Sequence, residues 1–405
     1  MENTNLKPVV RFPEFIDDWN ATKFENHFEF KNTNSLSRDK LNYESGEVKN
    51  IHYGDIHTKF STHFDKSKID LPFINQDIDI SRIDEENYVQ DGDLVMADAS
   101  EDYADIGKTI EITNTNNERI LAGLHTFLAR KTDETLAPEF FGHLLTTYRV
   151  RLKLMRIAQG TKVLGLSKGR VEKIPLTIPK PQEQKKIATF LTTVDSRITL
   201  LKEKKDALVD YKKGVMHQLF NQDIRFKDDK GNDFPDWEKK KLGDVLDYEQ
   251  PTKFIVESTE YNDNYKTPVL TAGKTFVLGY TNEKKGIYKE PPVIIFDDFT
   301  MANKFVDFEF KVKSSAMKIL KVKDDSVKIK YVYESIQMIN YPQGDEHKRF
   351  WISEYSKIKI PYPSPKEQTK IANYLTALDV KVDALEDKID SSVNFKKGLL
   401  QKMFV

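Results

Sequence analysis

Two stretches of the chain carry apolar residues at alternating steps of three and four, which places those residues along one face of a helix. One stretch begins near Pro181 and ends at Phe220; the other begins near Pro365 and ends at Phe404. The spacing persists over several heptads, which is typical of a coiled-coil seam. The predicted seam positions are Ile187, Leu191, Val194, Ile198 and Leu201 in the first stretch and Ile371, Leu375, Leu378, Val382 and Leu385 in the second.

The two stretches are copies of each other. Residues 179–220 and 363–404 align without gaps and share 18 identical residues in 42 positions, which indicates an internal repeat. Each copy starts with two prolines, which keep its helix from extending further toward the N-terminus. An amphipathic helix packed on its own domain would explain either stripe alone. The length of both stripes and their lysine-rich outer faces favour two helices packed against each other.

The segments before each helix, 1–178 and 222–362, are predicted to be mixed α/β domains. Segments rich in β-branched and aromatic residues predict strands at 93–100, 108–113, 293–298 and 305–312. Apolar periodicity predicts helices at 138–158 and 330–340, and a Gln-Gly pair follows each of these helices. A Phe-Pro-acid sequence followed by Trp19 or Trp237 opens both domains. The expected fold is therefore α+β, with two similar frames that carry different interiors.

Composition narrows the class of protein. A chain of 405 residues suggests two or three domains. It has no cysteine, which excludes disulfides, thiolate metal ligands and a cysteine nucleophile, and this composition fits a reducing compartment. We find no signal peptide and no apolar run of membrane-spanning length in the sequence. We therefore expect a cytoplasmic protein that does not associate with membranes.

The charge balance is nearly even, with a formal net charge of −1. That balance argues against a uniformly basic nucleic-acid binder, but binding depends on local patches rather than on the average. Residues 145–173 form such a patch, since they contain eight lysines and arginines and a single acid, Glu172. A solvated helix face followed by a loop is the alternative interpretation of this stretch.

Several possible catalytic or metal-binding motifs do not withstand inspection. The sequence TAGKT at 271–275 has Pro268 where a phosphate-binding loop needs its first glycine. His52, Asp55, His57 and His63 match no metal-ligand spacing, so no metal site is predicted, and a DNA-facing strand and loop is the preferred interpretation of this segment. Asp297 and Asp298 lack the Glu-x-Lys of a nuclease and are expected to cap a buried strand end. No glycine-rich cofactor loop or adenine-methyltransferase tetrapeptide is present.

The duplicated PxPxEQ motif, the IA pair that follows it, the lysine-rich helix and the Gln-Gly loops together resemble the specificity subunit of a Type I restriction-modification system. The resemblance covers the whole chain. It implies target recognition domains at 1–178 and 222–362, which each contact one half of a split DNA site, and spacer helices at 179–221 and 363–405. In that family the two helices form an antiparallel coiled coil with a pseudo-twofold internal repeat.

Because those cofactor and methyltransferase motifs are missing, we expect this chain not to be an enzyme and to bind no cofactor. The partners that the resemblance implies are double-stranded DNA, two methyltransferase subunits and, through them, restriction-translocase subunits. S-adenosylmethionine, ATP and Mg²⁺ would then act in those partners, which would methylate adenine or cleave DNA. A coiled-coil scaffold that joins two protein-binding domains is the alternative function, and the near-neutral charge favours it.

DNA contacts are expected from basic, amide, hydroxyl and aromatic side chains on loops, because phosphate contacts position a protein and base-edge contacts specify sequence. The candidates in the first domain are Tyr53, His57, Lys59, Arg149, Arg156, Lys162, Ser167, Lys168 and Arg170. Those in the second domain are Lys274, Thr275, Gln343, His347, Lys348, Arg349 and Ser353.

Overall fold

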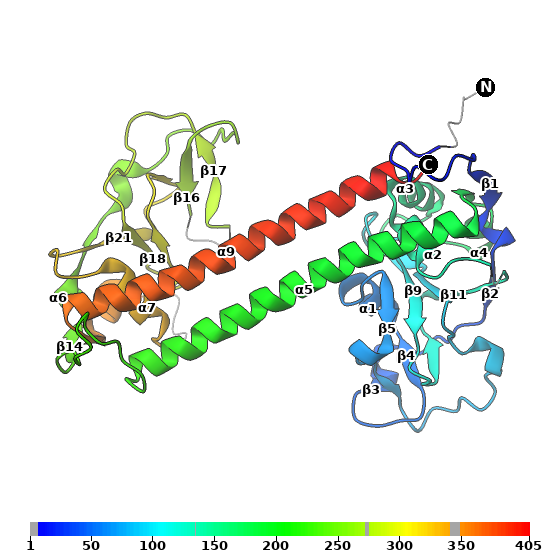
Figure 1. The fold of residues 1–405 in the computed structure, drawn as a ribbon, viewed down its shortest axis with the longest axis horizontal. Coiled ribbons are helices and arrows are strands. Elements are labelled where there is room, and N and C mark those ends of the chain that lie inside the picture. Colours follow the sequence, from blue (N-terminus) through cyan, green and yellow to red (C-terminus); the bar gives the residue numbers. More distant parts are fainter. Residues whose placement is uncertain (1–6, 134, 272–274, 341–348) are drawn as a thin grey trace. The chain divides into compact units, whose positions relative to one another are not determined.

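The computed structural model describes residues 7–133, 135–271, 275–340 and 349–405 (Figure 1). Contacts divide the chain into two compact units, Met1–Lys202 with Asp387–Val405, and Glu203–Glu386. The two long helices, α5 (Pro181–Phe220) and α9 (Pro365–Lys402), are each continuous from one unit into the other. No helix among the described residues is both long and apolar enough to cross a lipid bilayer.

The first unit is built on two sheets. Five strands in the order β2-β11-β7-β9-β5 form one sheet, four strands in the order β10-β4-β6-β3 form another, and β1–β13 and β8–β12 are separate pairs. The strands are β1 (Asn20–Lys23), β2 (Phe28–Lys31), β3 (Leu41–Asn42), β4 (Lys49–Ile51), β5 (His63–Asp65), β6 (Phe73–Ile74), β7 (Leu94–Ala97), β8 (Ala99–Ser100), β9 (Thr109–Asn114), β10 (Ile120–Ala122), β11 (Thr126–Lys131), β12 (Leu164–Gly165) and β13 (Pro175–Ile178). Its short helices are α1 (Tyr53–Thr58), α2 (Phe140–Thr146), α3 (Tyr148–Ile157) and α4 (Lys168–Glu172).

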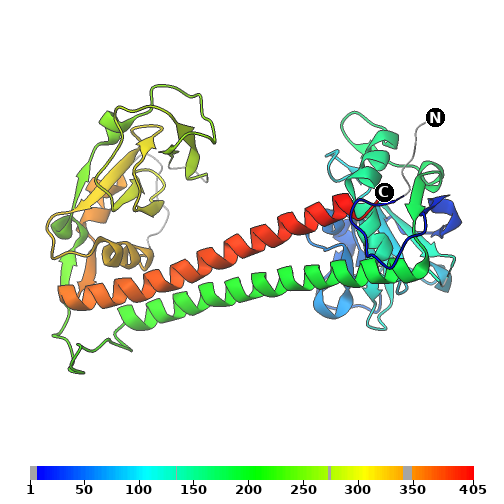
Figure 2. The same ribbon diagram turned by 45° about the horizontal axis from the view of Figure 1, so that its top comes forward.

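The second unit has a related but smaller framework. A four-stranded sheet in the order β15-β21-β18-β19 lies in the same unit as a three-stranded sheet, β17-β16-β20, and a β14–β22 pair. The strands are β14 (Glu238–Lys241), β15 (Leu246–Glu249), β16 (Thr267–Leu270), β17 (Val277–Thr281), β18 (Val293–Asp297), β19 (Asn303–Val306), β20 (Lys311–Val312), β21 (Met317–Val322) and β22 (Lys359–Tyr362). Its short helices are α6 (Leu242–Val245), α7 (Ile329–Gln337) and α8 (Phe350–Ser353), and Figure 2 shows α7 near the first turns of α9.

A helix and a strand that the sequence predicts as continuous are each interrupted in the structure. The helix expected at 138–158 breaks at Thr147, whose backbone is extended and whose hydroxyl donates to the carbonyl of Leu144 at 2.7 Å. The strand expected at 305–312 also breaks, because the chain leaves one sheet after Val306 and joins the other at Lys311. Buried residues flank both breaks, Leu145 and Val150 in the first case and Val306 and Phe310 in the second.

Each unit contains opposite ends of the two long helices. In the first unit, Ile187 and Leu191 near the start of α5 share a core with Met403 and Phe404, which follow α9. In the second unit, the roles are exchanged, since residues near the end of α5 share a core with Ile371 of α9. Lysine–aspartate pairs join the helices in both units, Lys396 to Asp195 at 2.5 Å and Lys212 to Asp379 at 2.5 Å. The helices therefore run antiparallel.

The PxPxEQ motif of the first unit ties three segments together. The carboxylate of Glu183 accepts two hydrogen bonds from Arg11, at 2.7 and 2.8 Å, and one from the Trp19 indole at 3.3 Å. The next side chain, Gln184, accepts from the backbone N–H of Ala137 at 3.2 Å. A charged fork of this kind at a buried site fixes both position and orientation. We call this arrangement the clasp of the first unit.

The second unit has an equivalent clasp. Glu367 accepts from Arg225 at 3.2 and 3.0 Å and from the Trp237 indole at 2.9 Å. Gln368 accepts from the backbone N–H of Lys328 at 2.9 Å. In both units a short antiparallel strand pair accompanies the clasp, β1–β13 in the first and β14–β22 in the second. The repeat in the sequence thus corresponds to one structural frame, built twice.

Candidate nucleic-acid interface

The first group of predicted DNA contacts lies on helix α1. The sequence predicted a strand and loop here; the structure has strand β4 followed by a helix. The His52 side chain accepts a hydrogen bond from the backbone N–H of Gly54 at 3.1 Å, which caps the helix and explains the difference. Tyr53 and His57 are half-buried on this helix, and Lys59 follows it, exposed and paired with Asp55 at 3.0 Å.

A break in another predicted strand places this helix beside the basic stretch. The strand expected at 93–100 divides at Asp98 into β7 and β8. The His57 ring lies 3.0 Å from the carbonyl of Ala99 in β8, and Ser100 of β8 pairs with Leu164 of β12. Candidates that are about a hundred residues apart in the sequence therefore lie on neighbouring elements of one surface, which we call the β8 surface.

The basic stretch divides into structural and exposed cations. Arg151 donates to the carbonyls of Ala104 and Ile106 at 2.9 and 2.6 Å, and burial lowers its pKa. Arg149 and Arg156 of α3 are exposed and available to phosphates. Arg151 therefore holds the loop at 101–107 against α3, while Arg149 and Arg156 face solvent.

The loop after α3 carries Lys162 on a tight turn. Gly160 has a φ of +130°, and a Cβ at that position would lie 1.9 Å from the carbonyl oxygen of Val163. Only glycine fits there, which explains the Gln-Gly pair in the first domain. Lys162 and Ser167 are exposed.

The side chains of two further candidates in this region make contacts within the protein. Lys168 is half-buried, with its ammonium 3.3 Å from the carbonyl of Lys31 and near the rings of Phe30 and Phe127. Arg170 is exposed and donates to the carbonyl of Ile157 at 3.1 Å. Both side chains thus brace the segment around β12 as well as adding to its positive charge.

In the second unit, part of the predicted interface lies outside the described residues. Lys274, Gln343, His347 and Lys348 are in that category, whereas Thr275 and Arg349 are exposed and Ser353 is half-buried. Asp298 is buried, and its carboxylate accepts from the backbone N–H of Trp351 at 2.9 Å, in the first turn of α8. Asp297 accepts from the N–H of Phe299 at 2.8 Å. The aspartate pair is thus a structural cap, as expected, and it positions Arg349 next to α8.

Sequence reasoning missed three aromatic side chains at the β8 surface. His125 lies 5.3 Å from the Tyr53 ring, measured between ring centroids, and 3.3 Å from the carboxylate of Asp98. Tyr103, on the loop held by Arg151, and Tyr148, at the start of α3, are exposed by 57% and 66%. Single exposed aromatic side chains are common on protein surfaces, and these matter here because they lie beside the other candidates. No pattern in the sequence marks His125 or Tyr103. Periodicity placed Tyr148 on the apolar face of the helix predicted at 138–158, and that prediction is wrong because the helix breaks at Thr147.

The ten predicted seam residues occupy two kinds of place. Near the helix starts, Ile187, Leu191, Ile371 and Leu375 are buried in cores that also include the adjacent recognition domain. Among the rest, Ile198, Leu378 and Leu385 are buried, while Val194, Leu201 and Val382 are half-buried.

The four residues rejected as metal ligands do not converge, since His52 caps α1, Asp55 pairs with Arg38 and Lys59, and His57 faces β8.

Comparison with known proteins identifies the family to which the chain belongs. A family model described as the Type I restriction modification DNA specificity domain matches residues 16–209 and 235–394, which is most of the chain. The chain belongs to this family. It carries two copies of the DNA specificity domain, and the description is one of DNA recognition rather than of methyl transfer or DNA cleavage.

Individual relatives agree with this assignment. The Escherichia coli EcoR124I/EcoR124II specificity subunit of a Type I restriction enzyme is 49% identical over 164 residues, and this match covers 38% of the chain and only 40% of that subunit. A putative Type I restriction enzyme MjaX specificity subunit of Methanocaldococcus jannaschii is 23% identical over 98% of the chain and 95% of its own length. The crystal structure of the system's S subunit from M. genitalium shares the fold, with a TM-score of 0.62, 15% identity, and coverage of 98% of this chain and 99% of that one.

Proposed function

We propose that this chain is the DNA-recognition subunit of a Type I restriction-modification complex. Residues 1–178 and 222–362 each recognise one half of a split target, and the helices at 179–221 and 363–405 set the spacing between the halves and bind partner subunits. The chain itself supplies the address, while partner subunits methylate adenine or cleave DNA.

The duplicated clasp carries this proposal. Glu183 and Glu367 each hold an arginine and a tryptophan from the start of their own unit. The sheets that the two clasps support differ, five and four strands in the first unit against four and three in the second. Two similar frames with different interiors are what two different half-sites require, because sequence is specified by the side chains at base edges rather than by the frame.

Exposed cations on the β8 surface support the DNA contact. In this proposal Arg149, Arg156 and Lys162 neutralise phosphates, while Tyr53, His57, Ser167 and Arg170 contact a single half-site. The remaining predicted contacts among the described residues are Lys59 and Lys168 in the first unit and Thr275, Arg349 and Ser353 in the second. Lys162→Ala is expected to reduce affinity for all sequences and to lower the slope of log K against log salt by about 1. Lys185→Ala, which removes an exposed cation of α5 outside the basic stretch, is the control.

The repeat also bears on the partners. Tyr211 of α5 and Phe395 of α9 occupy equivalent positions in the two copies, and they are exposed by 52% and 57%. One such aromatic lies in each unit, so two identical partners could each use one of them, as a pseudo-twofold arrangement requires. We propose that these partners are two adenine methyltransferase subunits, with a restriction-translocase subunit joined through them. S-adenosylmethionine, ATP and Mg²⁺ then belong to the partners' reactions.

Mapping of N6-methyladenine across the genome, with and without this gene, tests the function. Loss of one split motif is the expected result. Replacement of residues 222–362 by the second domain of another family member should change one half of that motif and leave the other half intact. A change in both halves would contradict the assignment of one half-site to each domain.

The net charge of −1 favours the alternative function, a scaffold that joins two protein-binding domains. The same map distinguishes the two functions, because deletion of a scaffold leaves every methylated motif in place. If the purified chain, assembled with its partner subunits, bound no duplex DNA at low salt, that result would also favour the scaffold.

A further inference from the structure

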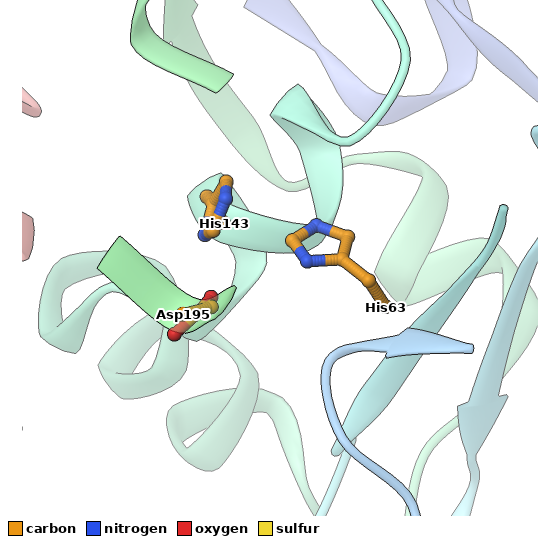
Figure 3. A group of neighbouring side chains, drawn as sticks. All are labelled: His63, His143 and Asp195. Carbon is orange, nitrogen blue, oxygen red and sulfur yellow. The ribbon is translucent and has the colours of Figure 1, made fainter. Parts of the chain in front are cut away.

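Three side chains from distant parts of the sequence meet beside the first long helix. His63 is on β5, His143 on α2 and Asp195 on α5 (Figure 3). Each offers one ligand atom, and these atoms all lie within 4.8 Å of one another. The ring centroids of the two histidines are 4.3 Å apart. Two imidazoles and one carboxylate form a donor set that suits Zn²⁺ and related late first-row metals.

The hydrogen bonds around His143 fix its protonation. The hydroxyl of Thr192 donates to the carboxylate of Glu139 at 2.5 Å, so at the 3.2 Å contact with His143 the hydroxyl must accept. The imidazole therefore donates through Nε2, and its Nδ1 carries the lone pair. His143 is fully buried, and its Nδ1 has no hydrogen-bond partner among the residues that the structure describes. A buried acceptor without a partner is costly, so this nitrogen marks the site as incomplete.

His63 is oriented by similar means. Its Nε2 lies 3.0 Å from the backbone carbonyl of Glu139, a group that can only accept, so Nε2 carries the proton and Nδ1 carries the lone pair. Burial lowers the pKa of both rings, that of His143 to about 2, so both imidazoles are neutral near pH 7. Neutral rings whose second nitrogen donates to a fixed oxygen are the usual form of metal-ligating histidines.

In the second unit, the position equivalent to His143 is occupied by a residue that forms ion pairs. Gln184 and Gln368 mark Ala137 and Lys328 as equivalent residues, and six residues further on, His143 corresponds to Glu334. Glu334 is buried and bonds to Lys212 at 3.2 Å and to Lys330 at 2.9 Å.

The other members of that network have equivalent residues in the first unit, Lys396 for Lys212 and Asp195 for Asp379. Asp379 bonds to Lys212 at 2.5 Å and to Lys330 at 2.9 Å, and the residue of the first unit that corresponds to Lys330 is Glu139. The first unit thus has a glutamate in place of a lysine and a neutral imidazole in place of a glutamate. Its polar cluster has two carboxylates, Glu139 and Asp195, against one lysine, Lys396, and is short of one cation.

We propose that His63, His143 and Asp195 bind a Zn²⁺ ion that ties β5 and α2 of the first recognition domain to α5. Lys396 competes with the metal, because its ammonium lies 2.5 Å from one Asp195 oxygen and 2.7 Å from the other. A Zn²⁺ ion needs ligands at roughly 2.0–2.2 Å, so the three side chains must draw together and Lys396 must swing away from the carboxylate when the ion binds.

The test uses the full chain, produced without a histidine tag, and the metal ion alone. Calorimetric titration with Zn²⁺ is expected to show one tight site per chain, and Co²⁺ in its place should give the intense visible absorption of tetrahedral nitrogen and oxygen ligation. His143→Gln and Asp195→Asn should each weaken binding by about a hundredfold. Lys396→Met removes the competitor and should strengthen binding several-fold. His217→Gln, which alters an exposed histidine of the same helix, should have no effect.

Two results would overturn the proposal. One is a wild-type chain that shows no tetrahedral Co²⁺ spectrum at saturating metal, a result that does not depend on the folding of any variant. The other is equal affinity in His143→Gln, Asp195→Asn and His217→Gln, which would indicate an adventitious surface ion only. Circular dichroism of each variant, compared with the wild type, separates loss of the site from loss of the fold.

Discussion

At the scale of single residues, the first recognition domain depends on a buried acid. The carboxylate of Glu111, on β9, accepts hydrogen bonds from the backbone N–H groups of Glu139 and Gly142 at 2.5 and 2.6 Å, in the first turn of α2. A Cβ on Gly142 would lie 2.7 Å from His63 Nε2, so glycine is needed for this close approach. Burial raises the pKa of Glu111 to about 7, although the two backbone donors act in the opposite direction.

This raised pKa predicts a dependence of stability on pH. Since the folded value lies above the ordinary value of 4.5, the contribution of Glu111 is fully present below pH 4.5 and is lost as the pH rises to about 7. The loss is at most about 3 kcal/mol. Glu111→Gln has no proton to lose, so its stability should vary less than that of the wild type between pH 5 and pH 7.

The measurement is urea unfolding at each pH, followed by pulse-labelling hydrogen exchange of peptides from residues 106–146 at one fixed labelling pH. The lowered pKa of His143 acts in the opposite direction, because its contribution is present above about pH 6.5 and is lost as the pH falls. The difference between variant and wild type therefore isolates Glu111. Glu101→Gln, an exposed acid in the same domain, should keep the wild-type slope; an identical slope in Glu111→Gln would refute the assignment.

At the scale of elements, the clasp is the feature that joins each long helix to its domain. Glu183 is 3% exposed and Arg11 is 12% exposed, so their paired charges are largely removed from water. Loss of one partner of a buried pair leaves an uncompensated charge, which costs about 3–5 kcal/mol. Because the two clasps lie in different units, each should fail separately.

Glu183→Ala is therefore expected to raise hydrogen exchange in the segment that contains β1 and in the first turns of α5, while peptides of the second unit stay protected. Glu367→Ala should produce the reverse pattern, with increased exchange around β14 and the first turns of α9. Glu203→Ala, an exposed acid of α5, is the matched control. Increased exchange in both units from either clasp variant would show that the clasps do not act independently.

At the scale of the whole molecule, the repeat predicts the number of partners. If Tyr211 and Phe395 each contribute to one partner site, Tyr211→Ala and Phe395→Ala should each reduce the bound methyltransferase subunits from two to one, and the double variant should bind none. Native mass spectrometry of the co-purified complex counts them. Leu200→Ala, which changes another exposed side chain of α5, serves as the control. Full occupancy in the double variant would place the partner surface elsewhere.

The helices also predict the spacing of the target. A helix rises 1.5 Å per residue, so a four-residue insertion after Leu201 lengthens α5 by about 6 Å and keeps its apolar face nearly in phase. The same two half-sites separated by a longer gap, by at most about two base pairs, is the expected change in the methylated motif. An insertion of two residues rotates the seam out of phase and should abolish the modification. An unchanged gap after the four-residue insertion would mean that the helix does not set the spacing.

The sequence by itself determined the parts of this protein that repeat. The heptad spacing, the proline pairs and the duplicated PxPxEQ motif predicted α5 and α9 and the frame of two domains, because a helix depends on residues three and four positions apart. The roles of Glu183 and Gln184 could not be predicted from that motif, since their partners Arg11 and Ala137 lie 172 and 47 residues away. Nothing local to the motif encodes those contacts.

Only the tertiary structure decided where side chains from separate elements meet. The sequence treated 93–100 as one strand, whereas the break at Asp98 brings His57 to β8 and β8 to the loop of Lys162. It also placed His63 among the wrong neighbours, because spacing along one strand cannot show that His143 and Asp195 face the same point. The physical reason is the same in both cases. Local patterns fix the conformation of an element, while long-range pairing and burial fix its neighbours, and a site is made of neighbours.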